Sequence, residues 1–220
     1  NGIIAAGVAL HYLNETQHHQ TKHILNISRI EEEKYVWMDK FTIRNLELFY
    51  SPNEGAKTLI DILDDTKSAM GARMLKRWLA LPLKEKKQIQ ERHNIVEQLI
   101  SDSKISETIS IEINNIGDLE RLISKVATLR INPKECSRLK DALIALTPIK
   151  TACNSSKLKE LNTIAKKIDT CDKIRKKIER ELSNDPPMLL HKGNVIKEGV
   201  NKELDELREI QNSGKDYLNQ

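Results

Sequence analysis

The sequence predicts a mainly α-helical protein, a multi-helix bundle that carries one or two small β-hairpins. Aromatic residues make up only 4% of the 220 residues, whereas charged residues make up 31%. This balance favours helices packed through aliphatic side chains over a sheet rich in aromatic residues. Along most of the chain, apolar residues recur at steps of three and four, which is the spacing of one helix face.

The N-terminal part predicts one helix and one hairpin. Apolar residues recur at helical spacing over 3–20, which predicts a helix there. The β-rich runs 24–30 and 35–38 flank the acidic stretch 31–33, and this arrangement predicts a small hairpin.

Residues 69–81 predict an amphipathic helix. Met70, Met74 and Trp78 fall on one face of it at steps of four. Packing in the core is the default interpretation of such an apolar stripe. Another helix is predicted after Pro82.

Two later helices carry clear start signals. Asp118 directly follows Gly117 and predicts the N-cap of a helix. Asn132, Pro133 and Glu135 form a complete signal. Asn caps the helix, Pro takes the first helical position, and Glu follows three residues after the cap.

The last third of the chain predicts a long helix, a turn and a final helix. Apolar residues recur every three or four positions over 157–182, which predicts one continuous helix that includes Cys171. The run 191–194, set between two apolar pairs, predicts a hairpin turn. A last helix is predicted from near Asn201.

Composition narrows the class of protein. The formal net charge is +4, and the stretch 157–181 holds nine basic and five acidic residues. Such a stretch is either a solvated helix face or a weak nucleic-acid contact, and both interpretations stay open. Three cysteines without CxxC spacing argue against a disulfide framework or a zinc site and fit a reducing cytoplasm. We expect no membrane span, because no long apolar run occurs.

No motif for catalysis or cofactor binding occurs in the sequence. The P-loop pattern G-x-x-x-x-G-K-[ST] is missing, as are GxGxxG and GxSxG. Asp61, Asp64 and Asp65 could hold magnesium, but a helix boundary is the simpler role for them. His19 and His23 would have metal-ligand spacing on a continuing helix, yet a solvated surface is the simpler expectation. We therefore predict no catalytic, cofactor-binding or metal-binding residue.

A polar string, Asp39, Arg44, Asn45 and Glu47, is interleaved with apolar residues. One interpretation is a surface turn. The other is a buried or interface charge network, because an Arg and a Glu three residues apart can satisfy each other. The sequence leaves both interpretations open.

Several motifs follow one another in a fixed order along the chain. They are MDKFTIRNLEL at 38–48, the runs 58–66, 69–79, 116–121, 185–187, 203–208 and 217–218, and the single residues Pro82, Arg92, Pro133 and Gly199. Together they resemble the core domain of MutS-type bacterial DNA mismatch-repair proteins. Several motifs in one order identify a family more specifically than any single motif does.

The resemblance implies a helical core domain from which lever helices run toward a DNA clamp. It divides the chain into the end of a connector domain at 1–22, the core domain at 23–197 and the start of a lever helix at 198–220. Asn1 stands where a complete protein begins with Met, and the helical pattern continues to Gln220. We therefore expect a piece of a longer protein.

The family motifs nominate residues with structural or interdomain roles. They are Asp39, Arg44, Asn45, Glu47, Gly71, Arg73, Trp78, Asp118, Glu120 and Arg121.

By resemblance, the parent protein is a cytoplasmic homodimer that binds ATP and Mg²⁺, mismatched double-stranded DNA and a MutL-type partner. The nucleotide and the mismatch are expected to bind domains that this chain lacks. The leading hypothesis is a segment that couples mismatch binding to ATP binding and hydrolysis. The alternative is a free-standing helical module that binds protein partners. A third hypothesis is direct DNA binding, with Lys173, Lys176 and Lys177 as weak candidates.

Overall fold

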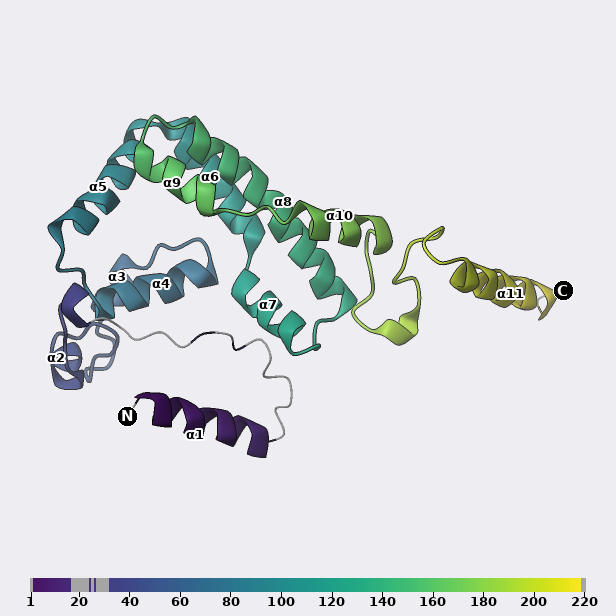
Figure 1. Cartoon of the computed structure of the whole chain (residues 1–220), viewed down its shortest axis with the longest axis horizontal. Helices are drawn as coiled ribbons and strands as arrows, with labels where there is room; N and C mark the ends of the chain where they lie inside the picture. Colours follow the sequence, from purple (N-terminus) through teal and green to yellow (C-terminus); the bar gives the residue numbers. More distant parts are fainter. Residues whose placement is uncertain (1, 17–23, 25, 27–31, 219–220) are drawn as a thin grey trace.

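The computed structural model describes residues 2–16, 24, 26 and 32–218, and they are mainly helical (Figure 1). The predicted fold class is thus confirmed. The helices are α1 (Gly2–Glu15), α2 (Lys40–Asn45), α3 (Leu59–Leu63), α4 (Ala69–Ala80), α5 (Lys86–Ser101), α6 (Ser103–Ile116), α7 (Leu119–Ala127), α8 (Pro133–Ser155), α9 (Lys159–Lys167), α10 (Asp172–Glu181) and α11 (Lys202–Leu218), with the 3-10 turns η1 (Glu32–Lys34) and η2 (Leu190–Lys192).

Helix α8 is the centre of the bundle, because it contacts α6, α7, α9 and α10. Its predicted start signal is confirmed in full. The side chain of Asn132 accepts a hydrogen bond from the N–H of Glu135 at 2.9 Å, and the Glu135 carboxylate accepts one from the N–H of Asn132 at 3.2 Å. Pro133 occupies the first turn, where its missing N–H costs nothing.

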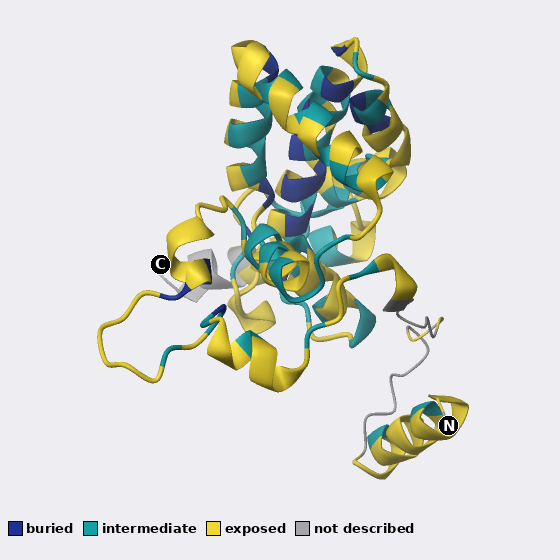
Figure 2. Cartoon of the chain, turned by 90° about the vertical axis from the view of Figure 1, so that its left-hand side faces the viewer, coloured by how far each residue is buried: buried dark blue, intermediate teal, exposed yellow. Residues whose placement is uncertain are grey.

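The core lies where α6 and α9 pack on α8. Ala142, Ala145 and Cys153 of α8 are at most 2% exposed, as are Leu161 and Ala165 of α9. The small side chains among them let the helices approach closely, and these positions belong to the buried core cluster of the described residues. Figure 2 shows most of the buried positions in the packed helices, whereas the helix near the N-terminus is mostly exposed.

The single helix predicted over 157–182 is wrong, because the chain breaks between α9 and α10. The Asp169 carboxylate accepts a hydrogen bond from the N–H of Cys171 at 2.9 Å. Cys171 takes a left-handed conformation with φ 48°. A residue in that conformation cannot continue a right-handed helix. The end of α9 is held by Lys150, whose Nζ donates to the carbonyl of Ile168 at 2.8 Å.

The predicted hairpin turn at 191–194 is also wrong. Residues Leu190–Lys192 form η2, and Ile196 pairs with Leu182 at the end of α10. The backbone N–H groups of Ser183 and Lys197 complete this pairing, each donating across it at 2.9 Å. The segment after α10 therefore forms a long loop whose end pairs with the C-terminal end of α10, and it does not form a tight hairpin.

Residues 35–38, one run of the other predicted hairpin, pair with a segment that lies far away in the sequence. Tyr35 pairs with Leu83, and the N–H of Val36 donates to the carbonyl of Pro82 at 2.7 Å. The proposed partner run 24–30 lies largely outside the described residues. Within the described part of the chain, extended pairing is limited to isolated bridges.

The two terminal helices follow the predicted pattern. Helix α1 covers most of the predicted span 3–20, and the last positions of that span lie outside the described residues. Helix α11 begins next to Asn201, whose side chain accepts the N–H of Leu204 at 3.1 Å. Across the described ranges, each helix is too short or too polar to cross a membrane.

Candidate functional site

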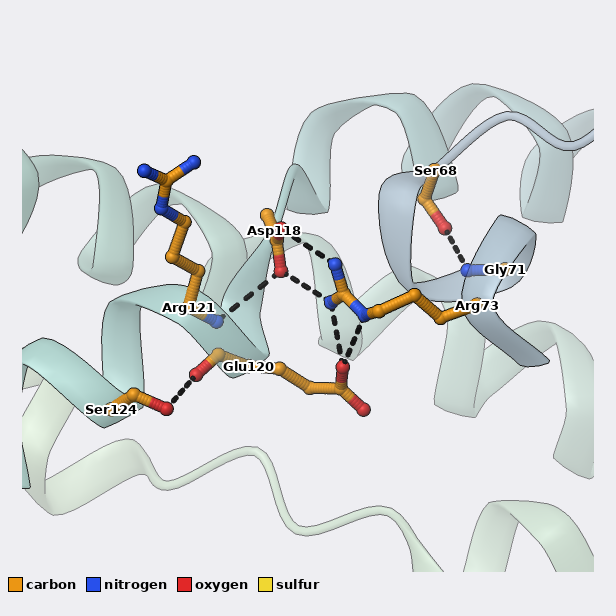
Figure 3. A network of polar contacts seen from close by, with 7 residues as sticks. All are labelled: Ser68, Gly71, Arg73, Asp118, Glu120, Arg121 and Ser124. Atoms are coloured by element: carbon orange, nitrogen blue, oxygen red, sulfur yellow. Dashed lines mark hydrogen bonds and ion pairs between the residues drawn. The ribbon is translucent and has the colours of Figure 1, made fainter. Parts of the chain in front are cut away.

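Arg73 of α4 joins two segments that are far apart in the sequence (Figure 3). Its Nη2 and Nη1 donate to the two carboxylate oxygens of Asp118 at 2.7 and 3.0 Å. Its Nε and Nη2 also donate to Oε2 of Glu120 at 2.9 and 2.6 Å. One guanidinium therefore binds two carboxylates in a planar, directional arrangement. We call these three residues the Arg73 junction.

Helix α4 is held in place for this contact by its own N-terminus. Ser68 is the N-cap, and its Oγ accepts the N–H of Gly71 at 3.1 Å. A Cβ added at position 71 would lie 3.2 Å from that Oγ and 3.4 Å from Cβ of Thr66. Glycine therefore lets the cap close tightly, two residues before Arg73.

On the other side of the junction, Asp118 has two tasks. It is the predicted N-cap of α7, and its Oδ1 accepts the N–H of Arg121 at 3.2 Å. The same oxygen binds Arg73. Gly117 precedes it with φ 64°, a conformation in which a residue with a side chain is strained. The turn between α6 and α7 thus aims the Asp118 carboxylate at α4.

The Arg73 junction brings opposite charges together, but its side chains remain partly exposed to water. Hydrogen bonds from Arg73 are the main reason why the pKa of Asp118 is lowered, and hydrogen bonds to Asp118 and then Glu120 raise the pKa of Arg73. The side chains of Arg73 and Glu120 are 48% and 67% exposed, whereas that of Asp118 is 25% exposed. Water therefore screens the attraction, and the main effect of the contact is to fix geometry.

Arg121 forms a hydrogen bond to the Arg73 junction through its backbone N–H, and its side-chain charge acts on Asp118 only at longer range. Figure 3 shows its guanidinium pointing away from Arg73, Asp118 and Glu120. Of the ten nominated residues, the structure brings Arg73, Asp118 and Glu120 into direct contact and places Gly71 at the start of the same helix as Arg73. The Arg121 guanidinium has no direct carboxylate partner among the described residues.

Trp78 does not lie in the core, so the prediction from its apolar stripe is wrong. Trp78 is 42% exposed and Met74 is 55% exposed, whereas Met70 packs against the core. Of the three stripe residues, only Met70 packs against the buried core cluster. The Trp78 ring is instead covered by Arg92 of α5, whose guanidinium carbon lies 3.6 Å from the ring centroid. The family motifs included Arg92 without a role, and local spacing gives no signal for this pairing.

The polar string at 39–47 is a capped surface turn. Asp39 is the N-cap of α2 and accepts the N–H of Thr42 at 2.7 Å, and hydrogen bonds from Thr42 lower the Asp39 pKa. Arg44 and Asn45 are exposed. Glu47 has φ 49° and ends the turn, and within the described residues no ion pair links it to Arg44. The interpretation of this string as a buried charge network is therefore wrong, whereas its role at an interface stays a prediction.

The three candidate lysines lie on α10. Lys173, Lys176 and Lys177 are exposed, and none has an ion-pair partner in the described part of the chain. Arg175 of the same helix is different, because it pairs with Asp172 at 3.5 Å and with Glu179 at 3.6 Å. Three unpaired charges on one short helix remain available for an anionic partner.

The aspartates at 61–65 take the helix-boundary role. Asp61 completes a capping box with Thr58, and Asp64 accepts a hydrogen bond from Thr66 Oγ1 at 2.6 Å. Across the described ranges, no three His, Cys, Asp or Glu side chains gather closely enough to hold a metal ion. His19 and His23, the pair with metal-ligand spacing, lie outside those ranges.

Comparison with known proteins identifies the family. The family "MutS domain III" matches residues 41–219. The chain is 52% identical over 218 residues to the DNA mismatch repair protein MutS of Bacteroides fragilis and to that of Bacteroides thetaiotaomicron. It is 51% identical over 217 residues to that of Flavobacterium johnsoniae. These alignments cover 99% of this chain but 25% of each relative, so the chain spans a quarter of their length. The chain therefore belongs to the MutS family of DNA mismatch repair proteins, and its residues 41–219 correspond to domain III.

Proposed function

We propose that this chain is a structural and allosteric coupling segment of a mismatch-recognition ATPase. It links the binding of mismatched DNA to the binding and hydrolysis of ATP elsewhere in the parent protein. The observation that carries the proposal is the Arg73 junction, which ties α4 to the start of α7 across 45 residues of sequence. The family assignment and the lack of a P-loop motif in the sequence support the same role.

A coupling segment needs parts that move as rigid bodies. Helix α8 has 23 residues and is therefore about 35 Å long. It is packed on four neighbouring helices, one of which is α7. A displacement of α4 would pass through the Arg73 junction to α7 and from there to α8. Coupling also requires that such parts have two arrangements. We propose that the two arrangements differ at the Arg73 junction.

We further propose the division of the chain that the resemblance implied. Residues 1–22, which include α1, would form the end of a connector domain. Two observations support this assignment: the described residues of α1 include none that is buried, and the family match begins only at residue 41. The core domain would cover 23–197. A lever that starts at 198 is supported by Arg208 of α11, which donates to the carbonyl of Ile196 at 2.8 Å and so fixes the direction in which the helix leaves the bundle.

The partners of the parent protein are part of this proposal. They are mismatched double-stranded DNA, ATP with Mg²⁺, a second copy of the parent and a MutL-type protein, in the cytoplasm. The names of the relatives support the role in mismatch repair, and the three free cysteines fit a reducing compartment. A free-standing interaction module fits less well, because each relative is about four times as long as this chain.

The experiment uses the full-length protein that contains this chain, with Arg73→Gln. We expect mismatched DNA and ATP each to bind as in the unmodified protein, because neither contacts Arg73 in this proposal. The factor by which ATP weakens binding to the mismatch should fall from the range of about 5- to 150-fold that is typical of allosteric coupling toward one. Fluorescence anisotropy with labelled mismatched DNA, with and without ATP, measures this factor.

Arg180→Gln is the matched control, because it also removes an exposed arginine that is bound to a carboxylate. The unmodified coupling factor is expected for this variant. The same factor in Arg73→Gln would contradict the proposal. A variant that no longer binds DNA at all would also count against it, because the Arg73 junction would then be needed for binding itself.

Direct DNA binding by α10 is proposed only as a minor contribution. Its support is the set of exposed lysines Lys173, Lys176 and Lys177. We expect the 220-residue chain to bind DNA weakly and without preference for a mismatch. If all three lysines met phosphates, the log–log slope of affinity against salt would be steeper by about 0.9 per lysine than in a variant with Gln at these positions. Binding that is tight and specific for a G·T mismatch would contradict this expectation.

A further inference from the structure

A cavity lies at the corner between the start of α7 and the first turns of α8. Its volume is about 550 Å³. Its charged lining comes from both helices and from the turn before α7, and consists of Asp118, Arg121, Lys125, Glu135, Arg138 and Asp141. We call it the α7–α8 cavity. It lies next to the Arg73 junction, because Asp118 belongs to both.

Each carboxylate in the lining already has a cationic partner. Asp118 binds Arg73 at 2.7 Å, Asp141 binds Lys140 at 3.1 Å, and Glu135 binds Lys125. The hydrogen bond from Lys125 is also the main reason why the pKa of Glu135 is lowered, so this carboxylate is charged and engaged at neutral pH. Each carboxylate of the lining is therefore already bound to a cationic side chain of the protein.

The two arginines of the lining are in the opposite situation. Within the described residues, neither Arg121 nor Arg138 has an ion-pair or side-chain hydrogen-bond partner. Figure 3 shows the Arg121 guanidinium turned away from the nearby carboxylates of the Arg73 junction. Asp118 and Glu135 attract these two guanidiniums only at longer range, so the N–H donors of both arginines remain without a bound carboxylate in the part of the chain that the structure describes.

We propose that the α7–α8 cavity binds a phosphate group through Arg121 and Arg138. A guanidinium is a planar fork of N–H donors that matches the oxygens of phosphate or carboxylate. A carboxylate has two oxygens and can fill one fork, whereas a phosphate has further oxygens for a second. Two forks on the wall of one cavity therefore favour phosphate, either as the free ion or as part of a nucleotide.

The test titrates the 220-residue chain with inorganic phosphate at constant ionic strength, with chloride as the balancing anion. Phosphorus NMR reports binding, and circular dichroism reports the fold of each variant. We expect saturable binding of phosphate. Arg121→Gln and Arg138→Gln should each weaken it by about 10- to 100-fold, as for the loss of a hydrogen bond to a charged group. Arg180→Gln, which removes an exposed arginine of α10, should leave it unchanged.

A gain-of-binding variant separates loss of the site from loss of the fold. Asp141→Asn removes a negative charge from the cavity wall, so phosphate should bind more tightly than to the unmodified chain. A misfolded variant would not bind more tightly. Weaker or equal binding by Asp141→Asn would overturn the proposal, as would the absence of saturable phosphate binding by the unmodified chain.

Two further probes identify the source of the phosphate. A nucleoside monophosphate that binds more tightly than the free ion, with the same dependence on Arg121 and Arg138, would support the cavity and assign it to a nucleotide. Short double-stranded DNA that binds through these arginines while free phosphate does not would overturn the cavity, because an open backbone-contact surface would then explain the result. Both outcomes can be distinguished from the coupling proposal, which is measured as the effect of ATP in the full-length protein.

Discussion

Arg92 covers the exposed indole of Trp78 and so links α5 to α4 with a guanidinium carbon 3.6 Å from the ring centroid. A cation over an aromatic face is attracted by the ring quadrupole, most strongly where water is partly excluded. Burial lowers the pKa of Arg92, which is consistent with a site that is partly removed from water. The pair therefore replaces the core burial that an apolar stripe normally gives a tryptophan.

Arg92→Gln should lower the free energy of unfolding by about 0.5–1 kcal/mol, the usual size of a partly exposed cation–π contact. Urea denaturation of the 220-residue chain measures the change. A double-mutant cycle with Trp78→Leu should return a coupling energy of the same size. Arg77→Gln on the exposed side of α4 is the control, for which we expect a change of about 0.5 kcal/mol at most. Additive effects in the cycle would show that the two side chains do not interact.

Leu161→Ala should destabilise the chain by about 2–5 kcal/mol, because Leu161 is 2% exposed and its loss leaves a cavity between α9 and α8. Ile100→Ala provides the matched comparison, since Ile100 is 79% exposed and its truncation should change stability by about 0.5 kcal/mol at most. Equal effects of the two variants in urea denaturation would mean that the bundle around α8 is not the core.

Asn132→Ala should lower the free energy of unfolding by about 0.5–2 kcal/mol, the usual cost of losing a helix cap. The variant removes the acceptor for the N–H of Glu135 at the start of α8. Thr151→Ala is its control, because the exposed Thr151 hydroxyl only donates to the carbonyl of Thr147 within the same helix. Alanine has the higher helix propensity, so this control should be neutral or slightly stabilising. A destabilisation equal to that of Asn132→Ala would contradict the capping role.

The Arg73 junction should make part of the stability depend on pH. Because the pKa of folded Asp118 is lowered, mainly by Arg73, the stabilisation is fully present above the unfolded pKa of about 3.9. It is lost as the pH falls through the folded value. We therefore expect Arg73→Gln to be less stable than the unmodified chain at pH 7, with a smaller difference at pH 2–3. Urea denaturation at several pH values gives this difference.

Other carboxylates with lowered pKa values, such as Asp39, Asp61 and Glu135, contribute to the acid sensitivity of both proteins. Only the difference between the two titrations therefore reports the Arg73 junction. A difference that stays constant from pH 7 to pH 2 would show that Arg73 acts through packing and not through the Asp118 carboxylate.

Local signals in the sequence predicted the helix starts well. The capping box of Asn132 and Glu135 and the N-cap of Asp118 are formed by residues within a single turn, so one stretch of sequence contains all the partners. The break at Cys171 could not be predicted in this way. Apolar spacing continues through it, and the turn depends on a left-handed residue that is neither Gly nor Asn.

The residues of the Arg73 junction could be nominated only from the family resemblance. The local sequence around Arg73 and around the N-cap residue Asp118 carries no signal that the two side chains meet, and 45 residues separate them. No periodicity in one sequence indicates that they meet. The same holds for Ile196, which pairs with Leu182 and not with its near neighbours, because tertiary packing and not turn chemistry selects the partner.

The contact between Arg73 and Asp118 closes a long loop that contains α5 and α6. Closing an unstructured loop of this length carries an entropic cost, which a solvent-screened ion pair is too weak to offset alone. The pairing of α5 with α6, which is local in the sequence, must therefore come first and bring the ends together. We therefore expect the two charged groups to meet late during folding and to separate early during unfolding. Helix α4 can accordingly be released while the packed helices around α8 keep their arrangement.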